Sequence, residues 1–288
     1  MTNVIQYRDS TDTTRGPSPS VWGDCPWMEI QAQVAQGSGG VAFWDDFVEA
    51  PLQGTQTTEI AWGHSPYKVY ATATGSIKPD ETFDSVETPG GLLIVSTPAD
   101  DEQSSLAHLN EPFKMSGNVT LDGKLWFEAR VAVTSTVTNG IGFMIGLAET
   151  QLWTLAAAVP FNAADAITNT ASFIGFRYPE DDTTTADTVY SDRATSFTNI
   201  GDAEVTGLAD NTFVKLGMVY DPGETDNCIR FYQDGKQLST KLSKSTLTGL
   251  TNLDAGTLGL IFSQICDSAG GSINTFIDWW RVAQVNPN

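Results

Sequence analysis

The sequence predicts an all-β protein: a sandwich of two antiparallel sheets, with an extended N-terminal arm and at most one or two short helices. Three observations predict it. Short segments that alternate apolar and polar residues fill most of the chain after residue 40, as is typical of strands. Glycine is abundant, with 26 residues, whereas lysine and arginine together total only 15 of the 288 residues. Threonine, which favours strands, is also frequent, so composition and pattern agree.

Residues 1–40 differ from the rest and predict an arm. A polar segment with two prolines opens it, and the glycine-rich segment 36–40 indicates a flexible break. Trp22 and Trp27 lie between these two segments. Exposed indoles lower solubility, so we expect the arm to dock through both tryptophans, either onto its own domain or onto a neighbouring molecule. The domain expected to follow spans residues 41–288.

Strands are predicted in order along this domain. The clearest is 124–133, which alternates so that Leu125 and Phe127 lie on one face and Trp126, Glu128 and Arg130 lie on the other. Further strands are expected at 141–148, 172–178, 188–192, 213–220, 228–233, 236–241, 258–264 and 273–285. Asp234-Gly235 predicts a tight type I′ hairpin between two of them. About a dozen short strands separated by turns indicate a sandwich.

Two further elements are expected. Residues 149–159 place apolar side chains at helical spacing and precede Pro160, which predicts one short helix. In the last strand, strict alternation places Ile277 and Trp279 on one face and Trp280 on the other. One tryptophan of that adjacent pair is therefore expected in the core and the other outside it.

Charge and composition exclude several classes of protein. The chain has 35 acidic and 15 basic residues, a net charge of −20. This acidity argues against binding to nucleic acid or to an anionic membrane surface, both of which attract basic proteins. No apolar run approaches the ~20 residues that span a bilayer. The N-terminus lacks the basic and apolar regions of a secretory signal, so we expect synthesis in a reducing cytoplasm. Cys25, Cys228 and Cys266 are an odd number without metal-site spacing, and we expect them to be buried apolar groups.

Catalytic patterns are not found in the sequence. Retaining glucanases need two carboxylates about 5–5.5 Å apart, and the nearest approach to such a pattern is Glu128, followed at alternate positions by Arg130 and Ala132. We expect Glu128 to form an ion pair with Arg130 instead. The two histidines, His64 and His108, lie in no nucleophile or zinc motif, and a structural role is expected for both. The chain is therefore predicted not to be an enzyme.

Binding sites are weaker predictions. No cofactor is expected, although acidic loops at 100–102, 180–182 and 221–224 leave Ca²⁺ open. Acidic residues also gather in 179–210, whereas Lys236 and Lys241 flank the predicted hairpin. This contrast favours either side-by-side docking of subunits or an acidic outer surface. The aromatic residues with a possible role in stacking on sugar rings are Trp62, Tyr67 and Trp279.

The order of strands resembles a known class of sandwich. Segment 125–131 reads Leu-Trp-Phe-Glu-Ala-Arg-Val, segment 213–220 ends in Val-Tyr before Asp221, and segment 232–236 reads Tyr-Gln-Asp-Gly-Lys. These segments are similar to the concanavalin A-like lectin/glucanase jelly roll, including laminin-G-like sandwiches. The resemblance covers roughly residues 41–285. It implies a fold more than an activity, because the matching residues describe strands and turns.

A narrower resemblance involves the N-terminal half. Tyr7-Arg-Asp-Ser-Thr-Asp, Trp22-Gly-Asp-Cys-Pro and Phe43-Trp-Asp-Asp-Phe look like segments of tailed-phage virion proteins of this class. The resemblance implies a capsid decoration protein on the exterior of the virion, made in the host cytoplasm. Its partners would be the major capsid protein and further copies of itself as a homodimer or homotrimer. Tyr7, Arg8, Trp22 and Trp27 would contact these partners, together with Lys236 and Lys241.

Two alternatives remain open. The first is a carbohydrate-binding domain that attaches a virion to a host surface, and the second is a glycoside hydrolase. If the arm is an anchor, deletion of residues 1–40 is expected to leave a folded body that no longer binds particles.

Overall fold

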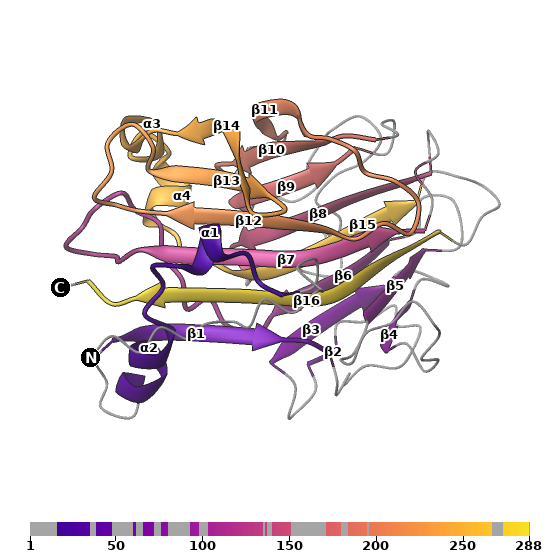
Figure 1. Cartoon of the computed structure of the whole chain (residues 1–288), viewed down its shortest axis with the longest axis horizontal. Helices are drawn as coiled ribbons and strands as arrows, with labels where there is room; N and C mark the ends of the chain where they lie inside the picture. The colour runs from indigo at the N-terminus through magenta and orange to yellow at the C-terminus, as the bar shows by residue number, and fades with distance from the viewer. Residues whose placement is uncertain are drawn as a thin grey trace.

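The computed structural model contains two antiparallel sheets of eight strands each, stacked face to face (Figure 1). It describes residues 16–34, 39–47, 60–61, 66–71, 76–79, 93–97, 103–134, 136, 140–150, 171–179, 184–194, 196–266 and 273–287. Every strand pair within these residues is antiparallel. The predicted all-β sandwich is confirmed.

Sheet A lies on the side of the molecule that carries the arm. In spatial order its strands are β14 (Lys236–Leu242), β13 (Ile229–Gln233), β12 (Val214–Tyr220), β7 (Leu125–Val133), β16 (Ile273–Val285), β5 (Leu93–Thr97) and β4 (Ser76–Pro79). The remaining strand, β1 (Gly40–Asp45), pairs with the second half of β16. The centre of sheet A is therefore β7 and β16, which come from distant parts of the chain.

Sheet B forms the opposite layer. In spatial order its strands are β11 (Thr198–Val205), β10 (Ala186–Ser191), β9 (Phe173–Tyr178), β8 (Ile141–Ala148), β15 (Gly259–Cys266), β6 (Gln103–His108), β3 (Tyr67–Ala71) and β2 (Ile60–Ala61). The predicted strand 141–148 matches β8 at both ends.

The core lies between the sheets, where strand alternation places it. In β7 the residues at alternate positions, from Leu125 to Val133, join the core, while Trp126 faces outward, as predicted. The Asp234-Gly235 pair has positive φ at both residues, 49° and 75°, as a type I′ hairpin requires.

The faces of β16 differ from the prediction. The register against β7 shifts between Ile277 and Trp279, which marks a β-bulge around Asp278. An extra residue in one strand reverses the phase of alternation. Ile277 and Trp280 consequently both point into the core, whereas Trp279 lies on the other face. Strict alternation had placed Ile277 with Trp279.

The described part of the arm contains helices where we expected extended chain. α1 (Pro19–Trp22) begins with proline at its first position, where the fixed φ favours a helix start. α2 (Trp27–Val34) follows Pro26, whose carbonyl accepts the amide of Ile30. Two other short helices, α3 (Lys244–Leu247) and α4 (Thr251–Ala255), connect β14 to β15. The described residues thus contain four short helices rather than one or two, and none of them is long and apolar enough to cross a membrane. Most of the helix expected at 149–159 lies outside the described residues.

Candidate functional site

The arm is packed on the outer face of sheet A. Figure 1 shows α1 in front of β7 and α2 beside the start of β1. The apolar cluster between arm and sheet consists of Val21, Trp22, Ile30, Trp126, Val219, Tyr232 and Ala283, with Cys25, Trp27, Ala42 and Val285 at its margin. Trp22 therefore docks on its own domain, which was one of the two alternatives for the arm. Burial of this apolar surface contributes to folding stability in proportion to its area.

Glu128 holds the start of the arm. Its side chain is buried, and its Oε2 accepts the backbone N–H of Ser18 and the indole Nε1–H of Trp22, both at 2.9 Å. Burial raises the pKa of Glu128, although the two donated hydrogen bonds and the charge of Lys215 act in the opposite direction. The expected ion pair with Arg130 is wrong. Arg130 instead bonds to Asp278, because the bulge brings that carboxylate to the outer face.

Further polar contacts fix the arm on both sides of Glu128. Lys215 Nζ donates to the carbonyl of Gly16 at 3.0 Å. Asp24 accepts the indole N–H of Trp126 at 2.8 Å and forms an ion pair with Lys124. Burial raises the pKa of Asp24, but these two contacts outweigh burial and hold the pKa below its usual value. The arm is thus bonded to β7 and β12 at several points.

The docked arm and β1 together expose a group of large apolar side chains. From α2, Met28 is 57% exposed and Trp27 is half-buried, and from β1, Trp44 is 45% exposed, with Val41 also exposed. The ring of Trp27 lies 5.0 Å from that of Trp44 and 5.5 Å from that of Trp22, measured between centroids. We call Trp27, Met28 and Trp44 the arm–β1 surface, because Val41 points to the opposite side of β1 together with Phe43.

The outer face of sheet B, which points away from the core, is where we looked for paired carboxylates in the described residues. On β9 this face carries Phe173 and Arg177, since both lie opposite the core residues of that strand. The nearest carboxylate on the neighbouring strand is Asp187, 3.9 Å from Arg177. Ser105 and Ser263 bond to each other at 2.5 Å across two further strands. The described part of this face therefore shows no pair of carboxylates that could act as acid and nucleophile.

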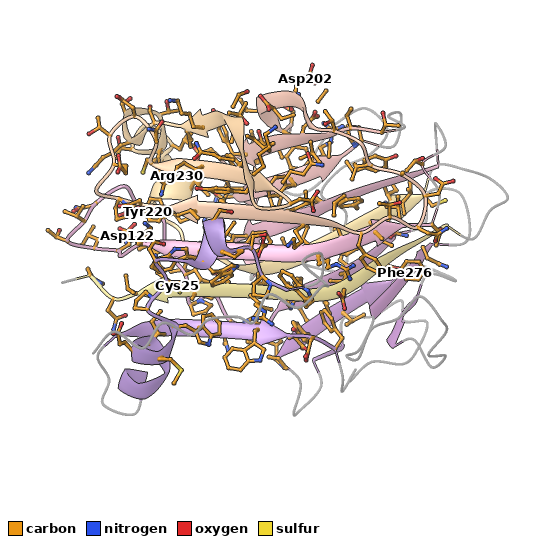
Figure 2. The ribbon with its side chains drawn as sticks, in the orientation of Figure 1. Cys25, Asp122, Asp202, Tyr220, Arg230 and Phe276 are labelled. Atoms are coloured by element: carbon orange, nitrogen blue, oxygen red, sulfur yellow. The ribbon has the colours of Figure 1, made fainter. Side chains whose placement is uncertain are left out.

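Other buried carboxylates are also engaged within the chain. Glu149 accepts two hydrogen bonds from Arg193 and the backbone N–H of Ser172. Burial raises the pKa of Glu149, but the contacts with Arg193 and Ser172 outweigh burial and hold the pKa below its usual value. Asp122 accepts bonds from Tyr220 and Ser116. Figure 2 shows Asp122 and Tyr220 side by side at one end of the sandwich. Each group stabilises a loop or strand end.

Two of the three aromatic residues considered for sugar stacking are buried. Tyr67 is 1% exposed, and its hydroxyl donates to Asp45 and accepts the indole N–H of Trp280. Trp279 is 3% exposed and lies beneath the guanidinium of Arg281, 5.3 Å from its ring centroid. Neither ring has a free face for a sugar. Tyr67 lies in the core between the sheets, and Trp279 is buried on the outer face of sheet A. Trp62 lies outside the described residues.

The residues considered for partner binding are dispersed. Tyr7 and Arg8 lie outside the described residues. Lys236 and Lys241 are exposed on β14, at one edge of sheet A, whereas the arm–β1 surface lies near β16. Lys236 follows Gly235, whose carbonyl accepts the hydroxyl of Ser20 in α1, so one of the two lysines lies next to the described start of the arm.

The structure describes one of the acidic loops considered for Ca²⁺ and one of the two histidines, and both form contacts within the chain. Of the three acidic loops considered for Ca²⁺, only 221–224 is described, and there Asp221 bonds to Lys124 and to the N–H of Gly223. No group of three potential metal ligands occurs among the described residues. His108 bonds through Nδ1 to the backbone of Asn110, and burial lowers its pKa. His64 lies outside the described residues.

The cysteines are free thiols. Cys228 and Cys266 are buried, as expected, whereas Cys25, which lies in the arm between α1 and α2, is only half-buried. Burial raises the pKa of both Cys25 and Cys228 to about 12. A thiol with such a pKa is a poor nucleophile near neutral pH.

Sequence reasoning missed the arm–β1 surface. Strand alternation in 40–45 could have shown that Trp44 faces away from the core, because its neighbour Phe43 packs inward. The contribution of Met28 could not be read in this way. It depends on the packing of α2 against β1, which only the folded arm reveals.

Comparisons with known proteins support the fold alone. No protein-family model matches the sequence, and no curated protein matches it. Among solved structures, a protein of unknown function from Shewanella oneidensis MR-1 has a TM-score of 0.55 at 12% identity, covering 87% of this chain and 88% of that chain. A pseudo β-1,3-glucanase of Mycobacterium tuberculosis has a TM-score of 0.48 at 12% identity, covering 85% and 98%. An endo-1,3-β-glucanase from Streptomyces sioyaensis has a TM-score of 0.48 at 14% identity, covering 86% and 96%.

These identities are too low to transfer an activity. The strand order, the two eight-stranded sheets and the match to the Shewanella oneidensis protein agree with the fold that the sequence resemblance implies. The chain has the concanavalin A-like lectin/glucanase jelly-roll fold.

Proposed function

We propose that this chain is a non-enzymatic structural protein of a phage particle that attaches to the outside of the capsid. The observation that carries the proposal is the arm: residues 16–34 are fastened to sheet A and present exposed apolar side chains beside β1. A surface built in this way suits lasting attachment to another protein. The resemblance of the segments around Tyr7, Trp22 and Phe43 to virion proteins supplies the kind of particle.

The absence of enzymatic activity is part of the proposal. On the outer face of sheet B, β9 has Phe173 and Arg177, and Asp187 is engaged by Arg177. A retaining glycosidase needs two free carboxylates about 5–5.5 Å apart. Incubation of the protein with β-1,3-glucans is expected to release no reducing ends, and reproducible release would contradict this part of the proposal.

Electron microscopy of purified phage particles tests the attachment. We expect density for the sandwich at symmetric positions on the outer capsid surface, and mass spectrometry should find the chain in the same particles. Absence of the chain from intact particles, or its location only inside the head, would overturn the proposal.

Carbohydrate binding is the second candidate, favoured by the exposed indole of Trp44. Aromatic rings with one free face can stack on sugars. Screening the protein on a glycan array, alongside Trp44→Ala, tests this candidate. Specific binding that is lost in the variant would support it, and an array without signal at high protein concentration would count against it.

A further inference from the structure

We propose that Arg230 and Lys241, on the outer face of sheet A, form a site for a carboxylate, and that Asp202 of a second copy of the chain occupies it in a twofold dimer. These residues lie at the edge of the sandwich where β11 and β14 meet, away from the arm–β1 surface. The dimer therefore does not depend on the proposed attachment to a capsid.

Two basic side chains face each other in the ladder between β13 and β14. Arg230 pairs directly with Lys241 across the two strands. Because the neighbouring Ile229 points into the core, both basic side chains lie on the outer face of sheet A. Like charges in this arrangement repel each other. The Nε of Arg230 is also buried without a hydrogen-bond partner, so a carboxylate bound here would satisfy this atom and remove the repulsion.

The carboxylates of the same chain that surround this pair are engaged elsewhere or lie in exposed turns. They are Asp24, Asp221, Glu224, Asp226 and Asp234. Asp24 and Asp221 form ion pairs with Lys124, and Asp234 accepts a backbone N–H. Glu224 and Asp226 form no ion pair with Arg230 or Lys241 in the described part of the chain. Two further basic residues nearby, Lys236 and Lys244, add to the positive charge of this edge.

Exposed cations are rare in this chain. Among the basic residues whose exposure the structure describes, only Arg193, Lys236 and Lys241 are exposed. Arg193 is paired with Glu149, whereas the two lysines lie on β14 and form no ion pair within the described residues. The positive charge that remains for a partner is thus concentrated on one edge strand, and it favours an acidic partner.

An acidic counterpart lies on β11, beside β14 at the same edge. Hydrogen bonds join the end of β13 to the residue after β11, and Thr240 of β14 packs against Gly201 of β11. β14 and β11 therefore run in opposite directions. Lys241 and Asp202 each follow one of the two residues in contact, so they lie about 7 Å apart along the strand direction, a distance that a lysine side chain can bridge.

A strained bulge projects Asp202 beyond the edge. The register between β10 and β11 shifts beside Gly201, and Ala203 has a φ of 51°, which is unfavourable for a residue with a Cβ. The buried carboxylate of Asp187 holds this conformation, because it accepts the N–H of Ala203 at 2.8 Å. Figure 2 shows Asp202 pointing away from the body. Within the described residues its carboxylate has no cationic partner.

A twofold axis parallel to the strands brings the two sites together. Such an axis sets β11 of each copy beside β14 of the other, so the outer face of sheet B in one copy continues the outer face of sheet A in its partner. Asp202 then reaches Arg230 and Lys241 of the second copy, and the same contact forms twice. Side chains make this contact, since edge lysines and a bulge disfavour backbone pairing between strands.

The charge of the whole chain does not prevent such a dimer. Each copy has a net charge of −20, but at physiological ionic strength charges more than about 8 Å apart are largely screened, whereas ion pairs in contact are screened much less. A second copy fits better than an unrelated acidic protein, because its matching carboxylate already lies on the same edge and at a similar level.

The experiment measures the mass of the full-length chain by sedimentation velocity over a range of protein concentrations. The wild type is expected to dimerise. Lys241→Glu and Asp202→Lys should each raise the dissociation constant at least about 30-fold, because both contacts of the dimer then join like charges. An equimolar mixture of the two variants should dimerise again, since every reversed charge in the mixed pair meets an opposite one.

Glu29→Lys is the matched control. Glu29 is exposed on α2, which packs against β1, so this variant makes the same charge change as Asp202→Lys away from the edge. It should dimerise like the wild type, and thermal melting should show that all variants are folded. If a reversed variant does not fold, Lys241→Gln and Asp202→Asn replace it, each with an expected weakening of about tenfold.

Three outcomes would overturn the proposal. They are a wild type that stays monomeric, single variants that dimerise like the wild type, and a mixture of variants that stays monomeric. A monomeric wild type whose binding to capsid shells is lost in Lys241→Glu would identify the capsid protein as the occupant of the site. Capsid attachment is measured separately, so failure of the dimer leaves the proposed function intact.

Discussion

Glu128 shows how one buried carboxyl group determines where a distant segment lies. Alternation in β7 predicts that it faces away from the core, and this is confirmed. Its partners, Ser18 and Trp22, are more than 100 residues away in the sequence, so no local pattern indicates them. The nearest opposite charge in the sequence, Arg130, pairs elsewhere.

Docking of the arm should depend on pH through Glu128. Burial raises its pKa above the ordinary value of 4.5, so the docked state keeps the proton to higher pH than the undocked state. The contribution of this group to docking is therefore complete below pH 4.5 and is lost as the pH rises through the raised pKa. The indole N–H resonance of Trp22, followed by NMR against pH, measures this change.

Glu128→Gln is the control for this titration. The amide oxygen can still accept from Ser18 and Trp22, but it does not titrate. The same pH-dependent shift of the Trp22 resonance in this variant would show that another group is responsible.

Tyr220 is a second residue whose effect can be measured. Its hydroxyl donates to Asp122 and accepts the N–H of Gly117 at 2.8 Å. Tyr220→Phe leaves both partners without this group, and we expect a loss of about 1–3 kcal/mol in the free energy of unfolding, measured with urea. Tyr190→Phe, at a half-buried tyrosine packed against the same core, is the control and should lose less. Equal losses in the two variants would contradict the prediction.

At the scale of elements, the predicted strands and turns agree well with the structure. The ends of 141–148 and 273–285 are reproduced, because turns with glycine or polar residues bound long apolar runs. The helices of the arm were not predicted. Their short length gives little periodicity, and each is stabilised by packing on sheet A rather than by its own sequence.

The pairing of β8 with β9 requires glycine at Gly146. A Cβ there would lie 2.3 Å from the carbonyl oxygen of Ile174 and 2.8 Å from the Cα of Gly175. Both contacts are with backbone, so the strands themselves would have to separate. We expect Gly146→Ala to lower the free energy of unfolding by more than about 2 kcal/mol, or to prevent folding.

Gly223→Ala is the matched control for this substitution. Gly223 lies in an exposed turn, and an added Cβ would meet only the carboxylate of Asp221, at 3.2 Å. Its effect should stay within about 1 kcal/mol. Equal unfolding midpoints for the two variants would show that the strands tolerate the closer approach.

At the scale of the whole molecule, the arm belongs to the folded body. Deletion of residues 1–34 would expose Trp126, Val219 and Tyr232, which the arm now covers. We therefore expect the melting temperature to fall by about 5 °C or more and the truncated chain to bind hydrophobic dyes. A truncation of residues 1–15 keeps the described docked segment and should change less.

This expectation modifies the one drawn from the sequence, in which the body without its arm stays folded and loses only its anchor. If the chain without residues 1–34 melts like the wild type and binds no dye, the arm contributes little to stability. The earlier interpretation of the arm as an independent anchor would then be preferred.

The acidic side chains have different surroundings in different parts of the molecule. Within the segment 179–210, Asp187 is buried beside Arg177, and Asp192 accepts the backbone amides of Asn252 and Leu253 at the start of α4. Figure 2 shows Asp202 pointing away from the body at β11. Part of the acidic excess thus stabilises loops and part faces solvent, a division that composition does not show.

The sequence by itself determined the sandwich, most of its strands, the hairpin at Asp234 and the outward direction of Glu128. These features depend on the alternation of neighbouring residues and on turn chemistry, which are local. Only the tertiary structure decided that the bulge at Asp278 reverses the faces of β16 and that the arm folds back onto sheet A. It also decided that Trp27 packs against Trp44. Contacts between segments so far apart depend on how complete sheets pack, because a strand's own pattern fixes its faces and leaves its neighbours open.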